Sequence, residues 1–180
     1  VFIDLLKGYR YDPSEVHIKQ TGGDLEVEIA GLWYRTVLWE VPLLAIISEL
    51  FFRMTDQKPD DYRQRTIAKA KEFAATGAEL SEFGTRRRYS FEVQNQVIEI
   101  FKEHAGRFLN GTSNVYLAMK HNLTPIGTHP HEWFMYHGAH YGYRMANTIS
   151  LENWVDVYQG NLGIALTDTY TTDNFFHNFN

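Results

Sequence analysis

The sequence predicts an α/β protein in which a short β-containing region precedes a series of parallel βα units. The first third alternates apolar and polar residues on both sides of a Gly-Gly-Asp turn, as antiparallel strands do. From Pro42 the apolar residues recur at helical spacing. Beyond residue 80, an extended segment, a turn of small residues and a helical stretch follow one another four times. That repetition indicates a parallel sheet, either open and doubly wound or closed into a barrel.

The β-containing region is predicted to begin with a hairpin. The segment EVHIKQTGGDLEVEI, residues 15–29, alternates on both sides of its turn. The segment WYRTVLWEV, residues 33–41, is predicted to form a third strand.

The first predicted helix begins near Pro42, a residue suited to a first helical turn, and continues to about Met54. It contains the longest apolar run of the chain, VPLLAIIS at residues 41–48. A bilayer span needs roughly 20 apolar residues, so this run predicts a buried helix and not a membrane segment.

Two further helices carry recognisable end signals. Asp60 or Asp61 can cap the second, whose apolar face contains Ile67 and Ala70. Ser90 can cap the third, and Gly106 is placed to end it. The last ten residues, TTDNFFHNFN, also have the composition of a helical interior, so the chain is expected to be part of a larger protein.

The four βα units place their turns where ligands bind in parallel sheets, at the carboxyl ends of the strands. The extended segments end in ELSEFGT, RFLNGT, TPIGT and GIALTD. The turns predicted to face a ligand are Phe83–Arg87, Gly111–Asn114, Thr128–Glu132 and Thr167–Tyr170.

Composition excludes several classes of protein. A net charge of −5 provides no general basic field for nucleic acid or an anionic membrane. The absence of cysteine excludes disulfide frameworks, Cys-ligated zinc and thiol nucleophiles, and it fits a reducing cytosol. With 44% hydrophobic and 22% charged residues, the chain is globular rather than disordered.

The segment THPHEW contains the chain's most conspicuous histidines. His131 and Glu132 begin a metalloprotease-like helix, but that motif needs a second histidine where Met135 stands. A cluster of four histidines also lacks acidic residues at ligand spacing, so no metal site is predicted; its members are His129, His131, His137 and His140. The last two are predicted to be surface or capping residues, whereas the turn of His131 shares the ligand face.

Two turns have the character of anion sites. In GTRRRYS, residues 84–90, backbone N–H groups and arginine forks suit phosphate or carboxylate, although a solvated basic loop explains the same residues. The segment GTSN, residues 111–114, repeats the arrangement of a turn before a helix. Together with Asp168 at the fourth segment, they indicate an enzyme acting on a phosphorylated substrate.

Four segments, in this order, resemble the nicotinate phosphoribosyltransferase family of the bacterial and yeast type: FGTRRRYSFEVQ, GTSNVYLA, TPIGTHPHEWF and LGIALTDTYTTDNFF. WEVPLLAIISEL is similar to the helix that enters that family's barrel. The resemblance covers essentially all 180 residues. It implies part of an irregular parallel α/β barrel at residues 38–180, preceded at residues 1–37 by part of a small β-containing domain. It also implies a cytoplasmic homodimer with active sites at the subunit interface.

The same resemblance implies an enzyme of NAD biosynthesis and salvage. It would transfer phosphoribosyl from phosphoribosyl pyrophosphate to nicotinate, with ATP hydrolysis coupled through a phosphohistidine. ATP and phosphoribosyl pyrophosphate would be co-substrates, with Mg²⁺ bound to their phosphates. His131 matches the phosphorylated histidine, Asp168 would hold its other ring nitrogen, and His129 would be a neighbour.

Four residues match substrate-binding positions of the family. Phe83 would stack on the pyridine ring, and Arg86, alone or with Arg87, would hold phosphate or the nicotinate carboxylate. Ser113 would lie near that carboxylate. Glu82 stands where related enzymes often carry aspartate. This difference leaves the four roles unchanged.

The chain lacks the amino-terminal segment and later strands that the family has, so it is expected to be inactive alone. Two alternatives stay open. One is a related phosphoribosyltransferase that uses nicotinamide or quinolinate. The other is a non-catalytic α/β module that binds anions.

Overall fold

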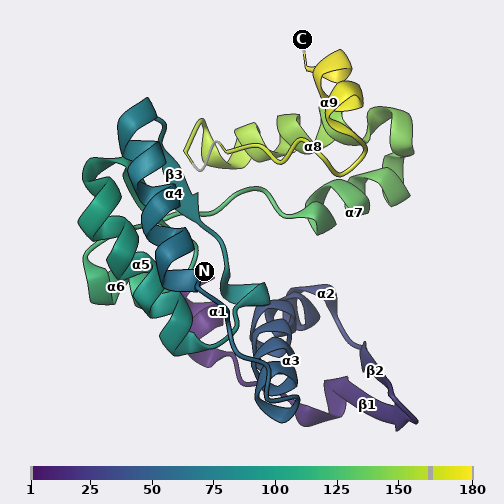
Figure 1. Ribbon diagram of the computed structural model, residues 1–180. Coiled ribbons are helices and arrows are strands. Elements are labelled where there is room, and N and C mark those ends of the chain that lie inside the picture. Colours follow the sequence, from purple (N-terminus) through teal and green to yellow (C-terminus); the bar gives the residue numbers. More distant parts are fainter. Residues whose placement is uncertain (1, 162–163, 180) are drawn as a thin grey trace. The chain divides into compact units, whose positions relative to one another are not determined.

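The computed structural model describes residues 2–161 and 164–179. The chain forms two compact units, residues 1–124 and 125–180 (Figure 1). The first unit contains nearly all the residues of the two β-sheets. The second contains α-helices joined by extended segments. The fold is therefore mixed α/β, as predicted.

The first unit opens with helix α1 (Phe2–Gly8) and a short 3₁₀ turn, η1 (Pro13–Glu15). Strands β1 (Val16–Thr21) and β2 (Asp24–Ile29) then form an antiparallel pair with Thr21 opposite Asp24. Gly22 takes a positive φ of 61° in the connecting turn, which a residue without Cβ adopts at little cost. The predicted hairpin is confirmed.

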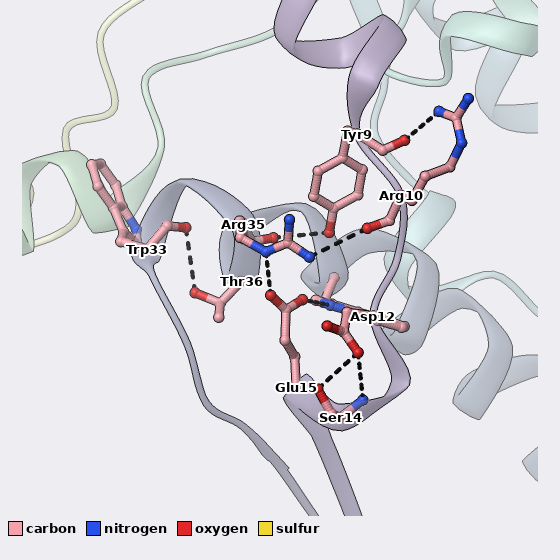
Figure 2. Close-up of polar contacts among 9 residues, drawn as sticks. Tyr9, Arg10, Asp12, Ser14, Glu15, Trp33, Arg35 and Thr36 are labelled. Atoms are coloured by element: carbon pink, nitrogen blue, oxygen red, sulfur yellow. Dashed lines mark hydrogen bonds and ion pairs between the residues drawn. The ribbon is translucent and has the colours of Figure 1, made fainter.

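The predicted third strand at 33–41 is wrong, because this segment is helical. It forms α2 (Trp33–Thr36) and η2 (Val37–Trp39) and then enters α3 (Glu40–Met54). The cause is a tertiary contact with Glu15 (Figure 2). Arg35 pairs with one Glu15 carboxylate oxygen, and Trp39 Nε1–H donates to the other at 2.9 Å. Residues four apart meet at one point on a helix but are separated by roughly 13 Å along a strand.

Helices α4 (Tyr62–Thr76) and α5 (Phe91–Ala105) supply most of the apolar core of the first unit. Its buried members are Ala70, Ile98, Phe101, Ala105, Leu109 and Leu117. Both predicted end signals of α5 are confirmed: Ser90 Oγ accepts from Val93 N–H at 3.1 Å, and Gly106 is the C-cap with φ of 55°. At α4 the N-cap position is Asp61, but its side chain makes no capping bond.

Helix α3 begins and ends close to its predicted limits but is not buried. Among its fifteen residues only Ala45 is buried. Its exposed apolar side chains are Val41, Leu44, Ile46, Leu50, Phe51 and Met54. The helix instead uses polar groups to hold the segment that follows β3: Ser48 Oγ donates to the Arg88 carbonyl at 2.9 Å, and Glu49 accepts from Phe91 N–H at 3.2 Å.

The second sheet has the order β3-β4-β5, with strands β3 (Leu80–Glu82), β4 (Leu109–Thr112) and β5 (Thr124–Pro125). Strands β3 and β4 are parallel, with Glu82 opposite Thr112. A turn and a helix follow each of these strands, as predicted, the helices being α5, α6 (Val115–His121) and α7 (His131–Tyr141).

The fourth predicted strand is not formed in the described part of GIALTD; its first residue, Gly163, lies outside the described residues. Ile164 to Asp168 lack regular structure, although the Ile164 carbonyl accepts from His129 N–H at 3.0 Å. A single backbone hydrogen bond does not constitute a ladder. Helix α9 (Thr172–Asn178) does follow this segment, capped by the Thr171 hydroxyl.

In the second unit, α7 packs on α8 (Tyr143–Tyr158). Buried Phe134 lies at the centre, and the His129 ring packs against Trp154 with 4.1 Å between ring centroids. His137 links the two helices: one ring nitrogen bonds the Trp133 carbonyl at 2.7 Å and the other bonds Asn153 Nδ2 at 2.9 Å. The prediction that His137 is a surface or capping residue is wrong, since it lies inside α7 and is only 1% exposed.

No helix within residues 2–161 and 164–179 combines the length and the apolar character needed to cross a bilayer.

Candidate functional site

The turn after β3 presents the first group of predicted site residues. Phe83 follows Glu82, the last residue of β3, and is 46% exposed. This exposure is expected for a ring that contacts a ligand and does not pack in the core. The chain then forms the 3₁₀ turn η3 (Thr85–Arg87). Arg87 N–H donates to the Gly84 carbonyl at 3.0 Å, which closes this turn.

The three consecutive arginines have different environments. Arg86 forms an ion pair with Glu40 at the start of α3. Arg88 is the most enclosed: its Nε lies 3.3 Å from a Glu49 carboxylate oxygen, and its guanidinium lies 5.4 Å from the Phe91 ring centroid. Arg87 is exposed and has no ion-pair partner within the described part of the chain. The Arg87 guanidinium is therefore available to bind an anion. Arg86 would have to leave the Glu40 carboxylate, or contact both it and the anion, to do the same.

The turn after β4 contains the second group. Ser113 is half-buried, and its N–H donates to the Glu82 carbonyl at 2.8 Å. Among the described residues, none hydrogen-bonds the Ser113 hydroxyl. Asn114 caps α6 by accepting from Leu117 N–H at 3.0 Å. Ser113 is thus held by its backbone while its hydroxyl stays available.

Glu82, a residue that is 9% exposed, joins these two turns through its carboxylate. The carboxylate accepts from Gly84 N–H at 2.5 Å, from the Thr112 hydroxyl at 2.6 Å and from Gln94 Nε2 at 3.1 Å. Sequence reasoning noted Glu82 only as a mild difference from aspartate. The parallel register of β3 and β4 sets Glu82 opposite Thr112, and this pairing shows that Glu82 has a structural role.

In the second unit, the structure brings His131 and the turn Thr167–Tyr170 together. His131 Nε2 lies 3.9 Å from an Asp168 carboxylate oxygen, and Nδ1 lies 3.0 Å from the Thr169 hydroxyl. The His131 side chain is 44% exposed. Thr169 lies in a turn that was predicted to face a ligand, but no motif distinguishes it from neighbouring threonines and it was not given a role. The ring is thereby hydrogen-bonded at Nδ1, has Asp168 close to Nε2 and remains accessible.

Tyr170 fixes this turn to α7. Its hydroxyl donates to the Phe134 carbonyl at 3.2 Å, and burial raises the pKa of the phenol above its usual value of 10.0. Gly138 makes room for the ring, because a Cβ at this glycine would overlap the Tyr170 hydroxyl oxygen. The glycine was not predicted to matter. It permits the close approach that positions Asp168 and Thr169.

The other histidines have structural surroundings. His129 is 3% exposed and belongs to the aromatic core described above, whereas His140 is exposed and stacks on Tyr136 with 5.9 Å between ring centroids. Within the described ranges, no three His, Asp or Glu side chains converge in a way that could hold a metal ion.

The sequence of this chain matches the profile of the nicotinate phosphoribosyltransferase (NAPRTase) family at residues 78–180 and that of the NAPRTase N-terminal domain at residues 1–48. It is similar to a protein of Chromohalobacter salexigens named nicotinate phosphoribosyltransferase, with 54% identity covering 99% of this chain and 46% of that protein. A protein of the same name from Desulforapulum autotrophicum is 47% identical, covering 99% of this chain and 47% of that protein.

Two solved structures resemble this chain. The crystal structure of nicotinate phosphoribosyltransferase from Porphyromonas gingivalis matches with a TM-score of 0.92 and 49% identity, over 99% of this chain and 47% of that one. A putative nicotinate phosphoribosyltransferase from Saccharomyces cerevisiae matches with a TM-score of 0.84 and 32% identity, over 99% and 48%. The chain therefore spans about half the length of the proteins that it matches.

Proposed function

This chain belongs to the nicotinate phosphoribosyltransferase family, and we propose that it carries part of the active site of an enzyme that makes nicotinate mononucleotide. The enzyme transfers phosphoribosyl from phosphoribosyl pyrophosphate to nicotinate and releases pyrophosphate. ATP hydrolysis assists through a phosphohistidine. The activity belongs to a protein of the relatives' length, in which the βα units described here form part of an irregular barrel.

The observation that supports this proposal most strongly is the parallel pairing of β3 and β4. It places an exposed aromatic ring, an uncommitted arginine and an available serine hydroxyl on two turns joined by the Ser113 N–H bond to Glu82. A pyridine carboxylate needs these three groups: an aromatic surface, a cation and a neutral donor. In the proposal Phe83 stacks on the ring, Ser113 donates to the carboxylate, and Arg87, with Arg86, holds anionic oxygens.

The transfer step breaks the bond between the ribose anomeric carbon and the pyrophosphate oxygen, and the pyridine nitrogen forms the new bond. Positive charge develops on the sugar and negative charge on the departing pyrophosphate. Fixed arginine donors stabilise that negative charge without reorganising during the reaction. The ion pair of Arg86 with Glu40 keeps its guanidinium oriented before substrate binds.

His131 accepts the phosphoryl group of ATP in the proposed coupling step. A neutral ring nitrogen attacks the terminal phosphorus, an N–P bond forms, and the P–O bond to ADP breaks. Thr169 and Asp168 lie at opposite ring nitrogens, at 3.0 Å and 3.9 Å. They orient the ring for this attack.

Mg²⁺ would enter with the phosphates, because it retains water and binds few protein carboxylates. Asp168 fits this behaviour, since its carboxylate is 64% exposed and is a hard oxygen ligand. The ion would neutralise charge on the phosphate oxygens. We further propose a cytoplasmic homodimer with active sites at the subunit interface, and a boundary near residue 37 between the small domain and the barrel.

The direct test uses the full-length protein, nicotinate, phosphoribosyl pyrophosphate and γ-³²P-ATP. We expect nicotinate mononucleotide to form and acid-labile label to appear on His131. His131→Ala should lose the label and ATP stimulation while keeping some ATP-independent synthesis, since the Phe83 and Ser113 turns remain intact. His140→Ala is the matched control, because His140 is exposed on the same helix.

His129→Ala is a poorer control, because it would leave a hole beside Trp154 in the aromatic core. Preference for nicotinamide over nicotinate would identify the related enzyme instead. Binding of phosphoribosyl pyrophosphate without any turnover would indicate a non-catalytic module. Equal labelling of wild type and His131→Ala would remove His131 from the mechanism.

A further inference from the structure

We propose that Glu82 is a positioning residue whose buried carboxylate sets the separation of the Phe83 turn and the Ser113 turn. It thereby controls how tightly the pyridine substrate is held between them. This inference rests on the proposed function for its substrate, but the underlying coupling of the two turns is a property of the fold.

The Glu82 carboxylate lies between the two turns and bonds a group in each. On one side it accepts from Gly84 N–H, directly after Phe83, at 2.5 Å. On the other it accepts from the hydroxyl of Thr112, directly before Ser113, at 2.6 Å. Each proposed substrate residue is therefore a chain neighbour of a group that Glu82 binds, so a displaced carboxylate moves both.

Gln94 on α5 provides a second hydrogen-bonded link between the two turns. Its Nε2 donates to both Glu82 carboxylate oxygens, at 3.1 and 3.2 Å, and to the Thr85 hydroxyl at 2.8 Å. Thr85 also accepts from Asn114 Nδ2 at 3.1 Å. Two routes thus join the turns, one through Thr112 and one through Gln94 and Thr85. A shared buried network of this kind holds its members in one arrangement.

The surroundings of residue 82 require a carboxylate. All three groups that reach it are donors, and a carboxylate accepts from all of them. A glutamine of the same length would put an N–H₂ group in place of one oxygen, where it would face Gln94 Nε2 and either Gly84 N–H or the Thr112 hydroxyl, and a buried donor would be left unpaired. The contact is also close: a Cβ on Gly84 would lie 2.6 Å from a Glu82 carboxylate oxygen.

A purely stabilising role for Glu82 makes a different prediction. Loss of stability lowers the folded fraction, and so lowers the apparent kcat while KM stays constant. A displaced pair of turns raises KM for the pyridine substrate in enzyme that is still folded. The split between KM and kcat therefore separates the two roles.

The experiment compares Glu82→Gln, Glu82→Asp and Ile98→Val in the full-length protein, well below each variant's Tm. Glu82→Gln should raise KM for nicotinate at least about tenfold, while kcat changes less. Glu82→Asp keeps the acceptors and should recover most of this loss. Ile98→Val is the control, because Ile98 is fully buried on α5, the helix that carries Gln94, but lies outside the hydrogen-bond network. It should lower Tm with KM unchanged.

A double-mutant cycle with Thr112→Val tests the coupling itself. Thr112→Val removes the hydroxyl that Glu82 accepts from, so the double variant should have a KM close to that of Glu82→Gln alone. Additive effects on KM, or a Glu82→Gln variant with normal KM, would overturn the proposal.

A second readout is independent of catalysis. Amide exchange at Gly84 and Ser113 should accelerate together in Glu82→Gln, because one amide bonds its carboxylate and the other its carbonyl. If the wild-type protein has no transferase activity, the proposed function fails while this exchange result still decides the coupling. Acceleration confined to Gly84 would contradict it.

Discussion

Ser113 is the residue on which the proposed choice of pyridine substrate depends. Its half-buried side chain offers a neutral hydroxyl, and its N–H bonds the carbonyl of Glu82, the residue before the exposed Phe83. An aspartate at this position would offer acceptor oxygens, which suit the amide of nicotinamide. A carboxylate would instead repel nicotinate, by roughly 4 kcal/mol for like charges about 4 Å apart at an effective dielectric of about 20.

Ser113→Asp in the full-length protein should therefore reduce kcat/KM for nicotinate by at least about tenfold, which uses only a third of that repulsion. Ser113→Ala is the matched control and should have a smaller effect, because it removes the donor without adding charge. The measurement is kcat/KM for nicotinate and nicotinamide at fixed phosphoribosyl pyrophosphate. An unchanged nicotinate value for Ser113→Asp would place this residue outside the pyridine pocket.

At Gly138 the predicted effect of an alanine substitution on stability is the opposite of what helix propensity alone would give. In an exposed helix, alanine would stabilise by about 1 kcal/mol relative to glycine. At this position a Cβ would overlap the Tyr170 hydroxyl oxygen. Gly138→Ala should therefore destabilise by about 1–3 kcal/mol, the usual cost of overpacking. It should also weaken ATP coupling, because Tyr170 adjoins Asp168 and Thr169.

Urea unfolding of Gly138→Ala and of Ala139→Gly, its exposed neighbour, provides the comparison. The neighbour should lose only the propensity term of about 1 kcal/mol and keep ATP coupling. A Gly138→Ala variant as stable as wild type would show that the Tyr170 ring can move aside at no cost.

At the scale of elements, the contact of Glu15 with the helical segment 33–39 makes stability depend on pH. Hydrogen bonds from Arg35 and then Trp39 hold the pKa of Glu15 below its ordinary value of 4.5. A lowered carboxylate pKa contributes stability above the unfolded-state pKa. That contribution is lost as pH falls from about 4.5 through the folded-state pKa.

Glu15→Gln should therefore destabilise the first unit at neutral pH and flatten this acid-side decline, while converging on the wild type at the lowest pH. Unfolding midpoints between about pH 3 and 7 measure the difference. Glu72→Gln, a change of the same charge at an exposed position on α4, should leave the profile unchanged. Parallel curves for wild type and Glu15→Gln would contradict the role of this ion pair.

At the scale of the whole chain, a large apolar surface is exposed. On α3 alone it includes Leu44, Ile46, Leu50 and Phe51. Exposed apolar side chains of this kind promote association. The isolated 180-residue chain should therefore bind the dye ANS and self-associate, and it should show no transferase activity.

Size-exclusion chromatography with light scattering, compared with the full-length protein, measures this association. Leu50→Lys and Phe51→Lys on the isolated chain should reduce it, whereas Lys69→Glu on α4 should not. A monodisperse, active monomer of the isolated chain would contradict the expectation that it is part of a larger enzyme.

The sequence by itself determined the features that depend on local chemistry. The β1–β2 hairpin follows from alternation around Gly22, and the limits of α5 follow from Ser90 and Gly106. Four strand-turn-helix units were predicted, and three of them are formed in the predicted order, because small residues after short apolar runs are local signals. Family membership was also evident from the motifs, and it identified Phe83, Ser113, His131 and Asp168 as candidates.

Only the tertiary structure decided what depends on partners distant in sequence. Residues 33–39 are helical because one helical face brings both Arg35 and Trp39 to Glu15, which no local pattern records. The consecutive arginines were equivalent in sequence, and α3 distinguishes them by supplying Glu40 to one and Glu49 to another. Glu82, buried between two turns, became significant only when β3 and β4 paired in parallel, because pairing places its acceptors opposite donors 30 residues away along the chain.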